Sequence, residues 1–387
     1  MAVEASASRL HKSRFSVAVA VLLLLSVFIQ YTTLSSNIGY LITLLVYVLF
    51  LSIFFIYFNE KVNVKKLYLF LFLLLAITAT ISTIINNSVA DSIRLVGLLF
   101  FTAANLFLIP CIIYYRYYYQ IVGRISALIV IVGLLPYLGF PTGYPIIDIS
   151  LWRGEVYLLP GVAPMTSVFS NPNTLGFFTF VGVLSALTEY IYKKSRISMF
   201  ILILNTFGLV LSNNRSGWLA LAIALGIYIV YKYWGRYGVL MYIFSGLSAL
   251  IGFTLIISNI LPVPDIFAEI TLNNRRQHWM HSIQIFIENP IIGDGLSHGG
   301  THNSYIRILA ALGSVGGITY FLLSFGTLIQ SAREIDNIET LSLTVALAGF
   351  VCVQMFEGGG FIGVGIHSIL ISITMGYYIT GRVFSNS

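Results

Sequence analysis

Apolar runs long enough to cross a lipid bilayer, which takes roughly 17–25 residues in a helix, recur along this chain. Of its 387 residues, 58% are hydrophobic and only 9% are charged, a balance that excludes a soluble globular domain. Backbone in lipid must satisfy its own hydrogen bonds, so these runs predict helices. The sequence therefore predicts an all-α fold, a polytopic membrane helix bundle that forms a single transmembrane domain over residues 1–387. Its twelve predicted spans cover about 15–34, 38–58, 66–85, 94–115, 119–138, 173–192, 197–213, 216–235, 238–258, 303–330, 339–356 and 361–380.

The basic residues are distributed unevenly between the two sides that alternating spans create. Fifteen of the 21 lysines and arginines fall on one side, which the positive-inside rule assigns to the cytoplasm. We therefore expect a multi-pass protein of the inner (cytoplasmic) membrane with both termini in the cytoplasm. The formal charge of +7 is spread over short connections, so we expect no nucleic-acid partner. The outer side, periplasmic or extracellular, holds no lysine but six arginines: Arg94, Arg153, Arg215, Arg275, Arg276 and Arg307.

Two long outer loops, at about 139–172 and 259–302, form the presumed active-site region. The first contains five prolines, so we expect an irregular, turn-rich segment. The second has apolar residues at helical spacing from about 274 to 288, which predicts a short amphipathic helix in the membrane interface. Asn289-Pro290 ends that helix, because the residue before a proline is disfavoured in a helix.

The start of the span at 173–192 reads Phe169-Ser170-Asn171-Pro172-Asn173. Asparagine and threonine are preferred at helix N-caps, because their side chains accept hydrogen bonds from free backbone N–H groups. The predicted cap is Asn173 or Thr174.

Three outer arginines are candidates for binding an anion. Arg215 stands at the outer boundary between two spans, and Arg275 and Arg276 open the predicted interfacial helix. One interpretation is that they anchor the protein at lipid headgroups. The other is a cluster for a pyrophosphate, since a guanidinium is always charged and binds two phosphate oxygens at once.

Two further residues at the outer boundary are candidates for acid–base chemistry. His302 immediately precedes a span, and histidine accepts a proton near neutral pH. The alternative for His302 is a hydrogen-bonded packing residue. Glu357 precedes three glycines at the end of another span, where it serves either as an acid–base group or as the counter-ion of an outer arginine.

A metal site is an alternative use of the histidines. His278, His281, His298 and His302, together with Asp294, have spacings that permit zinc ligation. The chain lacks an HExxH sequence, however, and the region around His298 has the composition of a flexible loop. We therefore expect no metal and no cofactor.

In this order and spacing, the motifs resemble those of the O-antigen ligase/polymerase family of integral-membrane glycosyltransferases. Phe169 to Asn173 is similar to the family's Asn-Pro-Asn start of a span, and Ser212-Asn213-Asn214-Arg215-Ser216-Gly217 to its Ser-x-x-Arg-x-Gly turn. Arg275-x-x-x-Trp279, Asn289-Pro290-Ile291-Ile292-Gly293-x-Gly295 and His302-Asn303 resemble its extended signature. The resemblance covers about residues 169–317.

The resemblance implies transfer of a sugar chain from a polyprenyl (undecaprenyl) pyrophosphate carrier to an acceptor hydroxyl, on the outer face and without a metal. It implies that Arg215 and Arg275 hold the pyrophosphate and that His302 is the base. Direct displacement inverts the anomeric centre. Further residues expected to bind pyrophosphate or glycan are Arg276, Asn303, Asn171, Asn173, Arg153 and Glu357.

Polymerase and ligase remain alternatives. The segment 276–301 is short, whereas ligases often carry a longer one that helps to admit a lipid A core acceptor, and this favours a polymerase of O-antigen or surface polysaccharide. The nine residues between Asn303 and Gly313, followed by Gly316, fit the ligase subgroup. An alternative of another class is a polysaccharide or lipid transporter or flippase, which many spans would also suit.

Overall fold

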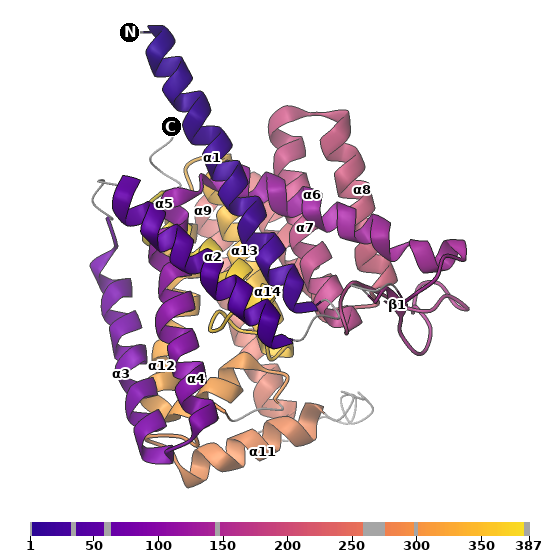
Figure 1. Ribbon diagram of the computed structural model, residues 1–387. Coiled ribbons are helices and arrows are strands. Elements are labelled where there is room, and N and C mark those ends of the chain that lie inside the picture. The colour runs from indigo at the N-terminus through magenta and orange to yellow at the C-terminus, as the bar shows by residue number, and fades with distance from the viewer. Residues whose placement is uncertain are drawn as a thin grey trace. The chain divides into compact units, whose positions relative to one another are not determined.

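A computed structural model gives the fold (Figure 1) and describes residues 2–31, 36–57, 63–143, 148–257, 275–297 and 301–382. Helices make up most of these residues, and the strands that they contain form one short antiparallel pair. In the described part of the chain, eight helical segments are long and apolar enough to cross a membrane, and three shorter apolar helices accompany them. The predicted all-α membrane bundle is confirmed.

The chain forms two compact units, and each is described by itself. Unit 1 comprises Met1–Asn63, Ala104–Ala222 and Val364–Ser387. Unit 2 comprises Val64–Ala103 and Ile223–Gly363. The expectation of a single transmembrane domain stays a prediction.

The helices of unit 1 pack around the one that begins at Pro172. Its elements are α1 (Ala2–Phe28), η1 (Ile29–Tyr31), α2 (Ser36–Tyr57), η3 (Ala104–Leu108), α5 (Ile109–Ile112), α6 (Tyr115–Gly133), η4 (Leu135–Leu138), β1 (Ser150–Leu151), β2 (Met165–Ser167), α7 (Pro172–Lys193), α8 (Arg196–Leu211), the first turns of α9 (Arg215–Ile257) and α14 (Ile366–Ile379). Helix α7 contacts α6, α8 and α14. Gly182 on α7 leaves room for Asn205, which donates a hydrogen bond to the carbonyl of Gly123 (3.0 Å). Small residues of this kind let membrane helices approach closely.

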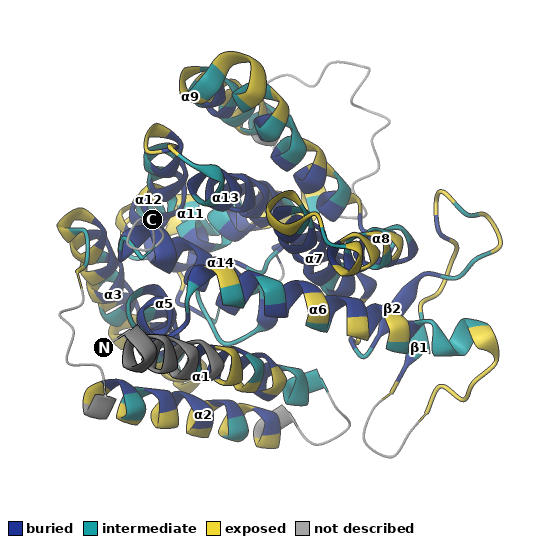
Figure 2. Ribbon diagram, turned by 90° about the horizontal axis from the view of Figure 1, so that it is seen from above, coloured by how far each residue is buried: buried dark blue, intermediate teal, exposed yellow. Residues whose placement is uncertain are grey.

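The helices of unit 2 pack around a central helix that begins at Ser304. Its elements are α3 (Lys66–Asn86), α4 (Val89–Gly97), η2 (Leu98–Thr102), the remainder of α9, α11 (Arg275–Glu288), α12 (Ser304–Arg333) and α13 (Ile338–Phe356). Helix α12 contacts α3, α11 and α13. Figure 2 shows α13 almost wholly buried, whereas α3 alternates between buried and exposed residues, as expected for a helix with a lipid-facing side.

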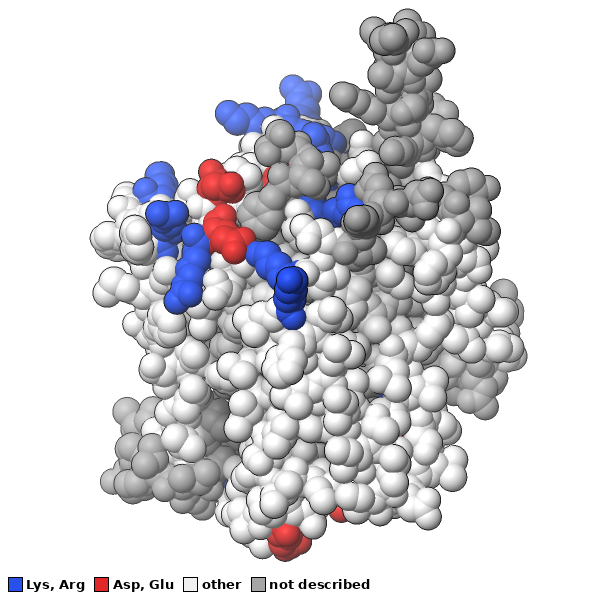
Figure 3. Space-filling view, turned by 90° about the vertical axis from the view of Figure 1, so that its left-hand side faces the viewer, with Lys and Arg blue, Asp and Glu red and all other residues white. Residues whose placement is uncertain are grey.

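Charged side chains of unit 2 mark one end of α3 and α12. Lys65, just before α3, pairs with Glu334, just after α12 (2.9 Å). On the face drawn in Figure 3, lysines, arginines and carboxylates gather near one end, and a broad uncharged band follows. An uncharged band is what a lipid-facing surface requires.

Helices α9 and α12 are each interrupted at a glycine. Gly235 in α9 has φ 60° and ψ −160°, at the boundary predicted between the spans 216–235 and 238–258. Gly313 in α12 has φ 69° and ψ −168°, inside the run 303–330 that was predicted to be one span. Positive φ is open to glycine and strained for other residues, which explains the residue type at both breaks.

The fourth predicted span begins earlier than the sequence suggested. Its helical path runs over Val89–Ile112, through the wide π-helical turns of η2 and η3, and Pro110 lies in its last turn. Such turns accommodate irregular packing without ending a helix. The last span is shorter than predicted, since α14 begins only at Ile366.

The first outer loop folds back on itself, as its prolines indicated. Strands β1 and β2 pair with Ser150 opposite Ser167, and residues 144–147 lie outside the described part. The predicted cap of α7 was wrong: Asn171 caps the helix by accepting from the N–H of Asn173 (2.8 Å). Pro172 at the first helical position explains the shift, because proline has no N–H and its φ suits that position.

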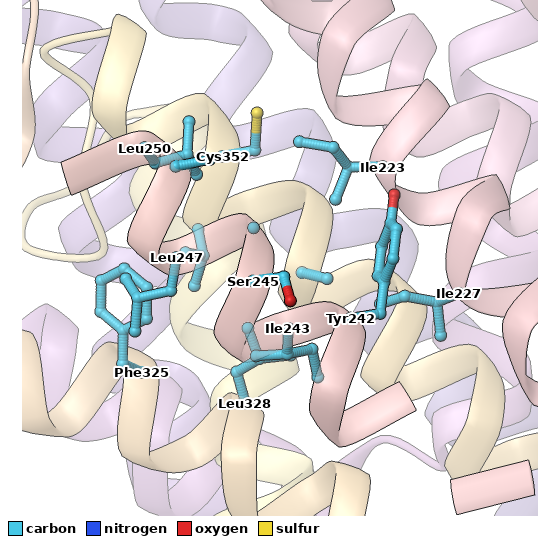
Figure 4. Close-up of a pocket in the computed structure, with 14 residues that line it drawn as sticks. Ile223, Ile227, Tyr242, Ile243, Ser245, Leu247, Leu250, Phe325, Leu328 and Cys352 are labelled. Carbon is cyan, nitrogen blue, oxygen red and sulfur yellow. The ribbon is translucent and has the colours of Figure 1, made fainter. Parts of the chain in front are cut away.

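An apolar cavity of about 310 Å³ lies among α9, α12 and α13 in unit 2. Figure 4 shows Ile227 and Tyr242 on one wall and Phe325 near the opposite side. None of the residues that line it belongs to the predicted site, so it is not the pocket in which we expect chemistry.

Candidate active site

The start of α12 fixes the position of His302. Asn303 caps the helix: its side-chain oxygen accepts hydrogen bonds from the backbone N–H groups of Tyr305 (3.0 Å) and Ile306 (3.1 Å). Asn303 is buried, at 1% exposure, whereas His302 is exposed. The cap therefore places the imidazole at the accessible edge of the first helical turn.

Helix α11 packs against this turn through Trp279, whose side chain is fully buried. Trp279 forms an apolar cluster with Ile306 on α12, and the ends of the predicted interfacial helix agree with α11 to within one residue. The packing brings His278 beside His302, with ring centroids 6.1 Å apart. The buried apolar contact between Trp279 and Ile306 therefore positions the exposed side chains of His278 and His302.

Arg275, the first residue of α11, forms an ion pair with Glu357 at the end of α13 (Nη2 to Oε1, 3.3 Å). Glu357 is buried, and its backbone carbonyl accepts a hydrogen bond from Ser304 Oγ (2.9 Å). Glu357 therefore links the ends of α11, α12 and α13. The ion pair is the contact that a counter-ion makes, whereas Arg276, the neighbour of Arg275, is exposed.

The surroundings of His302 favour its neutral form. Partial burial lowers the pKa of His302 below its usual 6.5, because desolvation disfavours the charged ring, and the neighbouring Arg275 and His278 lower it further. At neutral pH the imidazole therefore keeps a lone pair that can accept a proton.

The turn after α11 occupies the break in α12. A side chain at Gly313 would overlap the backbone of Ile291, and one at Gly293, where φ is +75°, would overlap Ala311. The N–H of Gly295 donates to the carbonyl of Ala311 (3.0 Å). Gly293 and Gly313 therefore allow the backbone of the turn to contact the backbone of α12. This contact accounts for the glycines, so a phosphate-binding loop is not needed to explain them.

Helix α4 holds the other side of the same turn. The buried carboxylate of Asp91 accepts from the N–H of Ser297, and Arg94 donates to the carbonyl of Leu296 (2.6 Å). The sequence analysis missed Asp91, because no local motif surrounds it. Hydrogen bonds to α4 and to α12 therefore hold the turn that precedes His302.

Arg215 begins α9, in unit 1, and its neighbour Asn214 organises the turn. Asn214 accepts from the N–H of Gly217 (3.0 Å), and its Nδ2 donates to the carbonyl of Asn173 (2.8 Å). The Asn-Pro-Asn and Ser-x-x-Arg-x-Gly motifs are therefore joined directly, although 41 positions separate the two bonded residues.

The first outer loop contacts the Arg215 side chain. The guanidinium lies 5.2 Å from the ring centroid of Tyr157, and Tyr157 donates its N–H to Asn213 Oδ1 (3.0 Å). Asn213, at φ 54°, also donates to the carbonyl of Glu155 (3.2 Å). Among the described residues, Arg215 forms no ion pair, and its side chain is exposed. Sequence reasoning missed Tyr157 and Asn213, although asparagine before a helix is a known signal for left-handed backbone.

The predicted site residues fall into two groups. Unit 1 contains Arg215, Asn171, Asn173 and Arg153, and unit 2 contains Arg275, Arg276, His302, Asn303 and Glu357. Contacts join the turn of Arg215 to Asn173, whereas Arg153 is exposed in the loop. The union of both groups in one active site stays a prediction.

The metal alternative finds no cluster in the residues that the structure describes: none of their histidines, cysteines and carboxylates form a group of three or more that could hold an ion. His298, one of its proposed ligands, lies outside those residues. The expectation that no metal is needed stays a prediction.

Comparison with known proteins bears on the segment that holds the catalytic candidates. Residues 200–321 match the family model described as O-antigen ligase, and this range includes Arg215, Arg275 and His302. The comparison with curated proteins gave no match. The match supports a membrane glycosyltransferase of the O-antigen ligase/polymerase type. The predicted resemblance is confirmed: over residues 200–321 the chain is similar to the O-antigen ligase family.

Proposed function

We propose that this protein transfers a glycan from a polyprenyl pyrophosphate carrier to a sugar hydroxyl on the outer face of the membrane. The observation that carries the proposal is the cluster of His302, Arg275 and Glu357 at the meeting point of three helix ends. It combines a neutral imidazole with a guanidinium held by a carboxylate.

The reaction breaks the bond between the anomeric carbon and the pyrophosphate oxygen and forms one to the acceptor oxygen. His302 takes the proton of the acceptor hydroxyl as the new bond forms. Arg215 and Arg275 bind the pyrophosphate, whose negative charge grows as it leaves, so their attraction is strongest in the transition state. Attack opposite the leaving group inverts the anomeric centre, and the two arginines supply the charge that a metal would otherwise provide.

We propose polymerisation rather than ligation, with both substrates on polyprenyl carriers. The short segment 276–301, half of which belongs to the single helix α11, supports this choice. The runner-up is an O-antigen ligase that transfers glycan to lipid A core, which the spacing from His302-Asn303 to Gly313 and Gly316 favours.

Purified protein in lipid nanodiscs, given a polyprenyl-pyrophosphate oligosaccharide with and without lipid A core, tests the function. A ladder without the core indicates a polymerase, and transfer only in its presence indicates a ligase. We expect His302→Ala to lower the rate by roughly 10²–10⁴-fold at unchanged protein level. Full activity of this variant would overturn the mechanism, and inhibition by chelators would overturn metal independence.

A lipid flippase is the second candidate, because α12 is broken at Gly313 and broken helices also occur in transporters. The nanodisc assay distinguishes a glycosyltransferase from a flippase, because a nanodisc encloses no second compartment into which a flippase could deliver lipid. A flippase makes no glycosidic bond there, whereas it moves labelled carrier between leaflets of a sealed vesicle.

A further inference from the structure

Arg307 is an arginine of unit 2 for whose charge the structure supplies no ion-pair partner among the described residues. It lies in the first helical stretch of α12, partly buried. Among the residues that the structure describes, it forms no hydrogen bond and no ion pair, whereas Arg275 is paired with Glu357. A guanidinium at membrane depth without an opposing charge is costly, so its presence points to a ligand.

The guanidinium of Arg94 adds a second positive charge to this part of unit 2. Hydrogen bonds of the turn at Gly295 and Leu296 bring the segment of Arg94 to the segment of Arg307. The backbone explains the proximity: Arg94 donates to Leu296, and the N–H of the preceding residue, Gly295, donates to Ala311, one helical turn after Arg307. Two like charges held near each other repel, unless an anion lies between them.

The carboxylate nearest to this pair in sequence forms no ion pair with either arginine. Asp91, one turn before Arg94 on α4, is buried and accepts from the N–H of Ser297. In the described part of the chain, Asp91 forms no ion pair with Arg94 or Arg307. The partial exposure of Arg307 leaves a route by which a ligand can reach the pair.

We propose that Arg94 and Arg307 form a second anion site, which binds the pyrophosphate of the acceptor's own carrier. This inference rests on the proposed polymerase function. A polymerase needs two such sites, because the donor pyrophosphate leaves while the acceptor pyrophosphate stays intact. Arg307 lies in the first turn of α12, five positions after His302, which directly precedes the cap of that helix, so the second site lies near the base. Paired guanidinium groups suit a pyrophosphate, since each binds two oxygens in one plane.

The test compares two acceptors with one donor, in nanodiscs of phosphatidylcholine. The donor is a polyprenyl-pyrophosphate oligosaccharide whose acceptor hydroxyls are blocked, so that it serves as donor only. The acceptor is either the unblocked carrier-linked oligosaccharide or the same oligosaccharide released from its carrier. We expect Arg307→Gln to lower transfer to the carrier-linked acceptor by about tenfold or more and to leave transfer to the free acceptor unchanged. Arg94→Gln should lower transfer to the carrier-linked acceptor more than transfer to the free acceptor, because Arg94 also holds the turn before His302. Arg333→Gln, at the far end of α12, is the matched control and should affect neither.

The outcomes separate this inference from the proposed function. If the unmodified protein makes no product with either acceptor, the proposed function fails. If it makes product but Arg307→Gln lowers both transfers equally, the second site is refuted and the polymerase proposal stands. Thermal unfolding of the variants shows whether such an equal loss comes from misfolding.

A further arm distinguishes the carrier from membrane phospholipid as the source of the anion. The assay is repeated in nanodiscs that contain phosphatidylglycerol. If the effect of Arg307→Gln on the carrier-linked acceptor then disappears, the site binds lipid headgroups and the inference is overturned. If the loss stays specific to the carrier-linked acceptor, the inference is supported.

Discussion

Arg215 and Arg275 are both candidates for binding the same pyrophosphate, but their surroundings differ. Arg275 is partly buried and paired with the buried carboxylate of Glu357. Arg215 is exposed, rests over the ring of Tyr157 and, among the described residues, has no carboxylate partner. A paired guanidinium is fixed in orientation but partly neutralised, whereas an unpaired one keeps its full charge.

The difference suggests a division of labour within the proposed mechanism. Arg275 contributes mainly geometry, because its ion pair sets the ends of three helices around His302. Arg215 contributes mainly charge, because nothing in its described surroundings offsets it. The four predictions that follow test this division, beginning with the largest expected effect.

Replacing either arginine should slow glycan transfer, and Arg215 should matter more for charge. We expect Arg215→Gln to lower kcat by roughly 10²–10³-fold, the usual cost of losing a group that stabilises developing negative charge. Arg215→Lys should recover part of the rate, whereas Arg275→Lys should not, because a lysine cannot reproduce the geometry of the pair with Glu357. Steady-state rates in nanodiscs measure this, and equal rescue by both lysines would contradict the division.

The two arginines should also differ in their effect on stability. Arg275→Gln removes the ion pair with the buried carboxylate of Glu357, which we expect to cost about 1–3 kcal/mol of unfolding free energy. Arg215→Gln removes an exposed side chain and should change thermal unfolding little. The double variant Arg275→Gln with Glu357→Gln should recover stability, because it removes both charges. Lower stability of Arg215→Gln than of Arg275→Gln would reverse the comparison.

The pH dependence should respond to Arg275. Activity requires neutral His302, whose pKa lies below 6.5, so kcat/KM should stay high at pH 6.5 and fall only as the pH drops through that lowered value. Arg275→Gln removes a positive charge that lowers this pKa, so the fall should begin at higher pH in the residual activity of the variant. An equal shift in Arg215→Gln would mean that both arginines act alike on His302.

The smallest effect concerns the ring under Arg215. Tyr157→Leu removes a contact between a cation and an aromatic face, worth about 0.5–1 kcal/mol at an exposed site. We expect KM for the donor to rise about two- to fivefold with kcat nearly unchanged. Tyr157→Phe, which keeps the ring, is the control, and a large fall in kcat for Tyr157→Leu would assign the ring a role beyond positioning Arg215.

Much of the fold was predictable because hydropathy alone determines which segments enter a membrane. The turn at Gly235 was expected from the charges of Lys232 and Arg236 beside it. The break at Gly313 was not, because 303–330 is apolar throughout and the cause of the break is the backbone of Ile291, which comes from another segment.

The candidate site shows the same limit. Motif spacing was enough to select Arg215, Arg275 and His302, and the ion pair of Arg275 was one of two alternatives open for Glu357. The contact of Tyr157 with Arg215 was not predictable, because it depends on how a proline-rich loop folds back. The cap of α7 was predicted two or three positions too late, since the preference of proline for the first helical position outweighed the asparagine after it.

The cap at Asn303 has a consequence for how sequence variation at this position can be interpreted. The helix uses only the side-chain oxygen of Asn303, while its buried Nδ2 has no partner among the described residues. Aspartate or serine would satisfy α12 equally well, so the fold does not require an amide here. A strict requirement for asparagine at position 303 would therefore indicate that its amide nitrogen binds a group beside His302. Tolerance of aspartate would show that the side chain only caps the helix.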